Sequence, residues 1–329
     1  MKVRVAAVQP SSLMGADEFR NAGRALEYVR EAVEAGAQIV CFPEGYPGPY
    51  SGSLDSGGRL PDTPINMLRK QARELGIYIV AGCVEEAPDL PGCLRLAEKL
   101  IGPDGALIGN YYRIQPNHPV FNGYLMGGKT DIVPGEEFVV VETPLGKIGL
   151  LICSELFVPE LARILMLKGA DIIIAGGGGV HSPIRTKLTD TWQCVARARA
   201  AEDLVYVVVT QNIFREKTRG RTCIAGPEEM LGAREDPGLV IADLDMDRLY
   251  YLRTHFYDEE VLSPPEGEES VYKSRPGQNH DRRPEKYGDL VRPQPDAFDY
   301  RYMAQGKPWR REYEKIVNRP RPGLGGNEG

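Results

Sequence analysis

The feature that most constrains the fold is a regular alternation of short apolar runs with segments of helical periodicity over residues 1–262. The run VRVAAVQ (3–9) is followed by apolar residues at helical spacing between Phe19 and Val33. The pattern predicts further strands over 38–45, 77–86, 170–179, 204–212, 222–226 and 239–245, and further helices over 68–75, 159–169 and 187–202. Runs that are apolar throughout are typical of strands buried on both faces. The sequence therefore predicts one layered α/β domain with helices over packed sheets.

Two segments of this region predict pairs of neighbouring strands. Residues 95–113 surround a Pro-Asp-Gly turn, and residues 138–153 surround Pro144-Leu145-Gly146. Glycine and proline at these points favour tight reversals between strands.

Composition changes near residue 263. Residues 263–329 contain nine prolines and carry 13 Lys and Arg against 11 Asp and Glu. Too few apolar residues remain for a separate core, yet the segment includes Trp309 and several tyrosines. We expect an extended C-terminal arm that packs on the body or on a partner subunit.

Charge and cysteine content exclude several classes of protein. The net charge of -6 argues against nucleic-acid or anionic-membrane binding, and no apolar run is long enough to cross a membrane. The opening residues indicate a strand and not a signal peptide. Six scattered cysteines and four histidines lack the spacing of disulfide frameworks or metal sites, which predicts a cytoplasmic protein with reduced thiols, no metal and no cofactor.

Glu44 is a candidate general base. It follows the apolar strand IVCFP and precedes Gly45, at a strand end where α/β sheets commonly place ligands. Partial burial would raise its pKa and suit it to proton transfer. The alternative is a turn glutamate that caps a neighbouring helix.

Cys153 is a candidate nucleophile. It ends the strand KIGLLIC and precedes a strand-to-helix transition at Ser154 to Glu160. The dipole of the following helix could hold the sulfur as a thiolate, and backbone N–H groups at the turn suit an oxyanion. The alternative is an inert buried cysteine, the interpretation we give to Cys41, Cys83, Cys194 and Cys223.

Polar residues in three loops are candidates for substrate contact. Arg113 ends the strand GALIGNYYR, where its charge could stabilise an oxyanion, although an ion pair with a surface carboxylate is the simpler interpretation. The histidines of two loops could contact substrate or face solvent. The substrate-contact candidates are Tyr50, His118, Tyr124, Lys129 and His181.

Taken together, these segments resemble the nitrilase superfamily of carbon–nitrogen hydrolases. The resemblance covers most of residues 3–250 and rests on VRVAAVQP, the FPEG around Glu44, GKIGLLICSELFVPE around Cys153, ARARAAEDLVYVVVTQN and RTCIAGPE. RRPEKY at 282–287 is similar to a segment of amidase and carbamoylase members. The resemblance implies an αββα sandwich that dimerises through helices near the nucleophile, giving a four-layer αββααββα core.

The resemblance also implies a Glu–Lys–Cys triad, with Glu44 as base, Cys153 as nucleophile and the backbone N–H of Ser154 in the oxyanion hole. Here Arg113 stands at the lysine position, and no glutamate occurs between Arg113 and Glu136, where many members have one. Arginine keeps the positive charge but does not readily release a proton.

Two functions follow as hypotheses. The first is a thiol hydrolase of a small amide or N-carbamoyl compound, with a nitrile as a further alternative. The second is a silenced homologue that serves as a binding or scaffold subunit.

Overall fold

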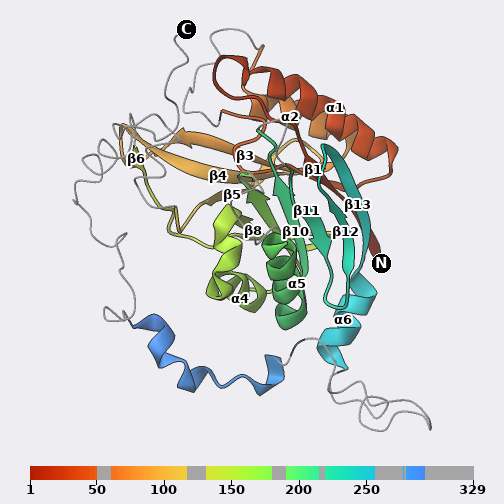
Figure 1. Cartoon of the computed structure of the whole chain (residues 1–329), viewed down its shortest axis with the longest axis vertical. Helices are drawn as coiled ribbons and strands as arrows, with labels where there is room; N and C mark the ends of the chain where they lie inside the picture. The colour runs from red at the N-terminus through yellow and green to blue at the C-terminus, as the bar shows by residue number, and fades with distance from the viewer. Residues whose placement is uncertain are drawn as a thin grey trace, which may run out of the picture. The chain divides into compact units, whose positions relative to one another are not determined.

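The computed structural model describes residues 1–49, 61–116, 131–179, 190–214, 219–255, 277 and 279–292. Two mixed β-sheets form its core, with helices on their outer faces (Figure 1). This is the predicted α/β sandwich, and the prediction of layered sheets is confirmed.

The first sheet has the order β13-β1-β2-β3-β4-β5, with β6 paired to β4. Strands β1 and β2, and β2 and β3, are parallel, whereas β13 pairs antiparallel with β1, and β5 with β4. Its strands are β1 (Lys2–Gln9), β2 (Ile39–Cys41), β3 (Tyr78–Glu86), β4 (Cys93–Ile101), β5 (Leu107–Tyr112), β6 (Asp131–Ile132) and β13 (Gly238–Asp245).

The second sheet has the order β12-β11-β10-β9-β8-β7. Its three central strands, β8, β9 and β10, are parallel to one another and apolar over most of their length. The other pairs, β7 with β8, β10 with β11 and β11 with β12, are antiparallel. Its strands are β7 (Val140–Thr143), β8 (Gly146–Ile152), β9 (Ile172–Gly177), β10 (Tyr206–Gln211), β11 (Thr222–Ala225) and β12 (Met230–Arg234).

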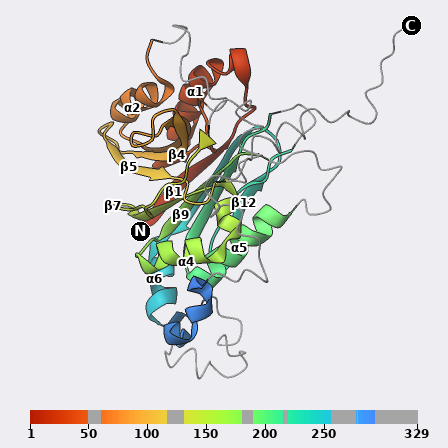
Figure 2. The ribbon, with the colours of Figure 1, turned by 90° about the vertical axis from the view of Figure 1, so that its left-hand side faces the viewer.

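Helices cover the two sheets on opposite sides, α1 and α2 on the first and α4 and α5 on the second (Figure 2). The α-helices are α1 (Arg20–Glu34), α2 (Pro64–Leu75), α4 (Pro159–Leu167), α5 (Thr191–Asp203) and α6 (Met246–Thr254). Short 3-10 helices occupy η1 (Gly15–Asp17), η2 (Cys153–Phe157), η4 (Asn279–Asp281), η5 (Pro284–Lys286) and η6 (Gly288–Val291).

Local sequence explains the limits of α2. The Thr63 side chain accepts a hydrogen bond from the Asn66 N–H, Pro64 occupies the first turn, and Gly76 ends the helix at a φ of 65°. These are standard capping signals, because they satisfy backbone groups that the helix leaves unpaired. Buried Leu68 and Ala72 then pack into the core between α1, α2 and the first sheet.

Contacts divide the chain into two compact units. The larger comprises Met1–Glu85, Arg95–Gln115 and Pro134–Arg282, and the smaller comprises Glu86–Leu94, Pro116–Val133 and Arg283–Gly329. Both sheets lie largely in the larger unit, and so do the strand ends considered below. RRPEKY, within the expected arm, contributes the short helix η5.

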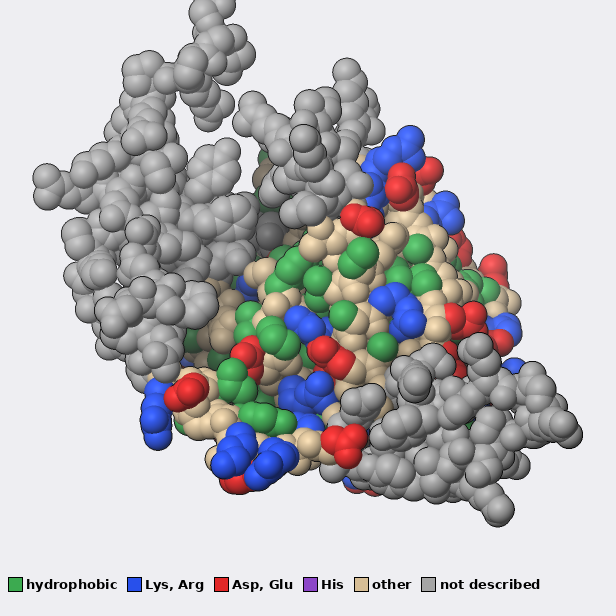
Figure 3. All heavy atoms as spheres, turned by 60° about the horizontal axis from the view of Figure 1, so that its bottom comes forward, with side chains coloured by type: hydrophobic (Ala, Val, Ile, Leu, Met, Phe, Trp, Pro, Cys, Tyr) green, Lys and Arg blue, Asp and Glu red, His purple; other side chains and the backbone are tan. Residues whose placement is uncertain are grey.

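The described surface mixes side chains of every kind. On the face shown in Figure 3, hydrophobic, basic and acidic side chains are interspersed. Of the described helices, none is both long and apolar enough to span a bilayer.

The cysteines Cys41, Cys83 and Cys223 are buried, as predicted. The same prediction was wrong for Cys194, which is exposed on α5.

Candidate active site

Four parallel strands from the two sheets end at a common place and bring four segments together. Glu44 follows β2, Cys153 follows β8, Gly178 follows β9 and Asn212 follows β10. The amide of Asn212 donates a hydrogen bond of 3.0 Å to the backbone carbonyl of Glu44, which ties the loop after one sheet to the loop after the other. Carboxyl ends of parallel strands are where open α/β sheets commonly bind ligands.

The loop that carries Glu44 is held by close backbone packing. A Cβ at Gly82 on β3 would lie 2.3 Å from the backbone nitrogen of Gly45, so only glycine fits there. The Gly82 N–H donates to the Tyr46 carbonyl at 3.0 Å. The Glu44 side chain is only 4% exposed, and burial raises its pKa, although Arg113 and Cys153 oppose that rise.

Cys153 directly follows β8 and is the first residue of η2, in a strained turn. Its φ of 55° lies in the left-handed region, which costs a non-glycine residue free energy and is characteristic of functional turns. The Sγ atom accepts a hydrogen bond from the Gly178 N–H at 3.4 Å. The buried carboxylate of Glu44 is near enough for its negative charge to raise the pKa of the thiol.

The thiol form of Cys153 dominates at rest. Burial, followed by the negative charge of Glu44, raises its pKa to about 12. The expectation of a thiolate held by a helix dipole was therefore wrong: the segment that follows is a 3-10 turn, and α4 begins only at Pro159. A base must remove this proton before the sulfur can attack, and the carboxylate whose charge acts on the thiol is that of Glu44.

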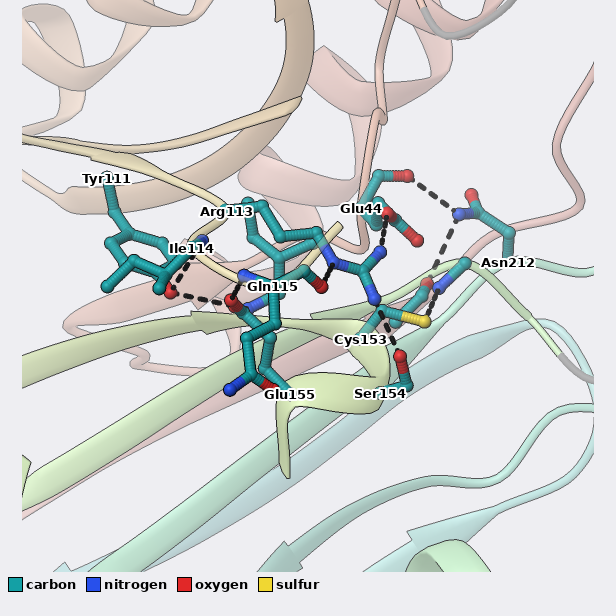
Figure 4. Close-up of polar contacts among 12 residues, drawn as sticks. Glu44, Tyr111, Arg113, Ile114, Gln115, Cys153, Ser154, Glu155 and Asn212 are labelled. Atoms are coloured by element: carbon teal, nitrogen blue, oxygen red, sulfur yellow. Dashed lines mark hydrogen bonds and ion pairs between the residues drawn. The ribbon is translucent and has the colours of Figure 1, made fainter. Parts of the chain in front are cut away.

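Arg113 brings the candidate residues into one network (Figure 4). Its guanidinium donates from Nη1 to Glu44 Oε1 at 2.9 Å and from Nη2 to Ser154 Oγ at 2.6 Å. Its Nε donates to the Gln115 carbonyl at 2.9 Å, and the side chain is 1% exposed. The structure thus brings together Glu44, Arg113, Cys153 and Ser154. The simpler interpretation, in which Arg113 pairs with a surface carboxylate, was wrong, because Arg113 is buried and pairs with the buried Glu44.

Glu155 supports this network, and the sequence analysis missed it. Its buried carboxylate accepts hydrogen bonds from the backbone of Ile152 at 2.8 Å and of Gln115 at 2.9 Å, and from the Tyr111 hydroxyl at 2.8 Å. It therefore joins the end of β8 to the segment that carries Arg113. An acidic residue among apolar neighbours, two positions after a candidate nucleophile, was the available signal.

Asn212 was also missed. Its side chain accepts from the Ser12 hydroxyl at 2.6 Å and donates to Glu44 and to the Gly177 carbonyl. The signal was the polar ending of VYVVVTQN, an otherwise fully apolar run.

The predicted substrate contacts Tyr50, His118, Tyr124, Lys129 and His181 lie outside the described residues. Within the described ranges, no group of three or more His, Cys, Asp or Glu residues is placed to hold a metal ion.

Comparison with known proteins places this site in a family. A model described as carbon-nitrogen hydrolase matches residues 4–254. Omega-amidase NIT2 of Xenopus tropicalis is 28% identical over 267 residues, covering 77% of this chain and 92% of the relative. Omega-amidase NIT2 of Homo sapiens is 27% identical over 252 residues, covering 71% and 86%.

Solved structures show the same fold. An amidase from Nesterenkonia sp. superposes with a TM-score of 0.62 at 23% identity, covering 75% of this chain and 92% of that one. Nit3 of Saccharomyces cerevisiae, described as a member of branch 10 of the nitrilase superfamily, gives a TM-score of 0.64 at 22% identity, covering 82% and 96%. The matched family model, which spans most of the chain, identifies it as a member of the carbon–nitrogen hydrolase family.

Proposed function

We propose that this hydrolase cleaves the C–N bond of a small amide through a thioester on Cys153. The observation that carries the proposal is the buried network around Arg113, which pairs with Glu44 at 2.9 Å and donates to the Ser154 hydroxyl beside Cys153. The charge of Glu44 acts on the Cys153 thiol. The relatives named omega-amidase support an amide as the substrate class.

The first half-reaction transfers the acyl group to sulfur. Glu44 removes the Sγ proton, and the sulfur attacks the amide carbonyl carbon while the C=O electron pair moves to oxygen. The backbone N–H of Ser154 and the charge of Arg113 stabilise this oxyanion. The oxyanion then collapses, the C–N bond breaks, and the protonated Glu44 gives its proton to the leaving nitrogen, which departs as ammonia or an amine.

The second half-reaction releases the acid. Glu44 removes a proton from water, and the oxygen attacks the thioester carbon to form a second tetrahedral species. Its collapse breaks the C–S bond, and the sulfur recovers the proton from Glu44. The net reaction converts the amide and one water into a carboxylic acid and ammonia or an amine.

Arg113 serves in this scheme as a fixed positive charge. A guanidinium keeps its proton throughout the accessible pH range, so every proton transfer passes through Glu44. Three hydrogen bonds hold the guanidinium in place, and such a preorganised charge needs no rearrangement when the oxyanion forms.

The same chemistry extends to related substrates. An N-carbamoyl compound offers a comparable carbonyl carbon, and RRPEKY at 282–287 favours amide or carbamoyl substrates. A nitrile would give a thioimidate first and would consume a second water. These remain alternatives to the simple amide.

A homodimer is the proposed assembly. Phe157, at the end of the nucleophile turn, and Leu167, the last residue of α4, are exposed, Leu167 by 57%. Pairing these surfaces with a second copy would bury them and give the four-layer arrangement.

The decisive experiment measures ammonia release and acylation together. The parent and Cys153→Ala are incubated with short amides, ω-amides of dicarboxylic acids, N-carbamoyl amino acids and nitriles, and ammonia release is measured. After an acid quench, the mass of the peptide that contains Cys153 is measured by mass spectrometry. We expect release and an acyl mass increment from the parent only. Cys194→Ala, which removes an exposed thiol, is the matched control and retains both signals.

Two results would contradict the proposal. Ammonia release that survives Cys153→Ala would exclude the sulfur as nucleophile. A folded parent that releases ammonia from no member of the panel would favour the scaffold alternative, which the arginine at the usual lysine position motivates.

A further inference from the structure

Another buried glutamate, Glu98 on β4, lies in the interior between the sheets. It is 0% exposed, and neither carboxyl oxygen has a hydrogen-bond partner among the described residues. Buried carboxyl groups are normally hydrogen-bonded or paired with a cation, because their desolvation is otherwise unfavourable. Glu98 therefore requires an explanation beyond core packing.

The carboxyl group of Glu98 lies near the backbone of Glu44, on the side where Gly176 faces both residues. Both carboxyl oxygens of Glu98 and the backbone nitrogen of Glu44 lie within 3.0 Å of the point where a Cβ on Gly176 would stand. Gly176 on β9 thus leaves the space that these two glutamates occupy. Any side chain at that position would displace one of them.

The neighbouring cations are engaged with other groups. Lys99, the next residue on β4, points to the opposite face of the sheet, where its Nζ lies 2.7 Å from Glu85 and 3.0 Å from Asn110. Arg113 donates to Glu44, Ser154 and Gln115. The cation of the site is thus directed at Glu44.

The protonation state of Glu98 follows from these surroundings. Burial raises its pKa well above the usual value, and the negative charge of Glu44 raises it further. Two interacting carboxyls in one buried site do not ionise independently, and the first charge goes to the group with the better partner. Here that group is Glu44, because Arg113 pairs with it.

We propose that Glu98 is a positioning residue that acts through Glu44: the two carboxyl groups share a single negative charge, and Glu98, held as the neutral acid, sets the alkaline limit of the pH range in which the site works. This rests on the proposed function, in which Glu44 is the base. Ionisation of Glu98 at high pH would add a second negative charge where the thiolate and the oxyanion develop, and would slow their formation.

Among the residues that the structure describes, two cysteines lie where the charge of Glu98 acts on them, Cys41 on β2 and Cys83 on β3. Burial raises the pKa of both thiols, so they stay neutral. Tyr111 lies directly across from Glu98 on β5 and donates its hydroxyl to Glu155. The second sheet contributes Gly176, which carries no ionisable side chain.

The kinetic test uses Glu98→Gln, which copies the shape of the neutral acid but cannot ionise. We expect kcat/KM near neutral pH within about threefold of the parent, KM unchanged, and the alkaline fall of activity shifted upward by at least about one pH unit. Glu98→Met serves if the buried amide prevents folding. Glu85→Gln, on the same part of the sheet but paired with Lys99, is the matched control and keeps the parental profile.

A spectroscopic test needs no catalysis. Infrared difference spectra of the Cys153→Ala protein at pH 8 should contain the carbonyl band of a protonated carboxyl that Glu98→Gln removes. In Glu44→Gln, which removes the neighbouring charge, this band should disappear at a lower pH than in the parent. This shift is the direct signature of a shared charge.

The outcomes separate this inference from the proposed function. Suppose that Glu98→Gln and Glu98→Met both release ammonia and that their activity falls at the same alkaline pH as in the parent. This result would overturn the inference and leave the proposed function intact. An absent band, or one that titrates independently of Glu44, would also overturn it. Loss of ammonia release on every substrate, with the coupled band present, would overturn the proposed function and leave the carboxyl pair.

Discussion

The Nη1 of Arg113 lies 2.9 Å from Oε1 of Glu44, inside the protein, with the two side chains 1% and 4% exposed. A buried ion pair of this kind contributes little net stability when intact, but loss of one partner leaves an uncompensated charge. The contact therefore determines both the stability of the site and the charge on its base.

Removing the guanidinium should be far more damaging than replacing it with lysine. Arg113→Met should lower the free energy of unfolding by about 3–5 kcal/mol, because Glu44 then has no partner. Arg113→Lys keeps the charge but loses the guanidinium N–H groups that donate to Ser154 and Gln115. It should lower the free energy of unfolding by about 1–3 kcal/mol and retain part of the activity. Urea unfolding and ammonia release measure both effects.

The exposed pair of Arg219 with Glu235 is the control for these variants. Arg219→Met should change the unfolding free energy by less than about 1 kcal/mol. Equal effects of Arg113→Met and Arg219→Met would refute the importance of the buried pair.

The acid side of the pH profile should report Glu44. Because burial raises the pKa of Glu44 above its ordinary value of 4.5, kcat/KM should begin to fall at a pH above that of an ordinary glutamate as the base becomes protonated. Glu44→Gln should reduce kcat by at least about 10²-fold. The control Glu142→Gln, which changes an exposed carboxylate, should leave the acid limb of the kcat/KM profile as in the parent. An acid limb at the pKa of a free carboxyl group would argue against Glu44 as the base.

Glu155 should matter for stability through its three donors. Glu155→Ala leaves two backbone N–H groups and the Tyr111 hydroxyl without their acceptor, and should cost about 3–5 kcal/mol. Tyr111→Phe removes only one of these bonds and should cost about 1 kcal/mol. The ratio of the two losses in chemical unfolding is the test, and similar losses would show that Glu155 does not organise the segment.

Asp203 at the end of α5 should make stability fall with rising pH. Burial is the main cause that raises its pKa from 3.8 to about 7, against the attraction of Arg163. A carboxyl whose pKa is higher in the folded state favours folding below its unfolded pKa, and that stability is lost as the pH rises towards the folded value. The contribution should therefore decline between about pH 4 and pH 7.

The variant Asp203→Asn removes this titration. Its melting temperature should change less than that of the parent between pH 4 and pH 7, with the gain over the parent largest at pH 7 and above. Glu202→Gln, the adjacent and more exposed carboxylate, is the matched control. Identical pH dependence of the parent and Asp203→Asn would disprove the assignment.

Much of the architecture could be predicted from periodicity. Runs apolar throughout correspond to the central parallel strands β9 and β10, and the proline- and glycine-containing turns at 103–105 and 144–146 correspond to the turns between β4 and β5 and between β7 and β8. Helix α6 was not predicted, since its apolar positions are too irregular to distinguish it from the preceding strand.

The chemistry of individual side chains was less accessible. Glu44 and Cys153 could be singled out because each directly follows a buried strand, but Glu98 lies within a strand whose polar residues point to opposite faces. Its proximity to Glu44 arises from packing between sheets, which no local pattern encodes. The same holds for Asn212 and for two of the three donors to Glu155, Gln115 and Tyr111, because these partners are tens of residues or more away in sequence.

The pairing of β1 with β13 joins positions well over 200 residues apart, over eight consecutive partners from Lys2 with Asp245 to Gln9 with Gly238. Contacts of such separation are slow to form, because a very long loop must close before they contribute. During synthesis the first strand must wait, with an unpaired edge, until nearly three quarters of the 329 residues have been made. A nascent chain of this enzyme therefore carries Cys153 well before its first sheet has all its strands.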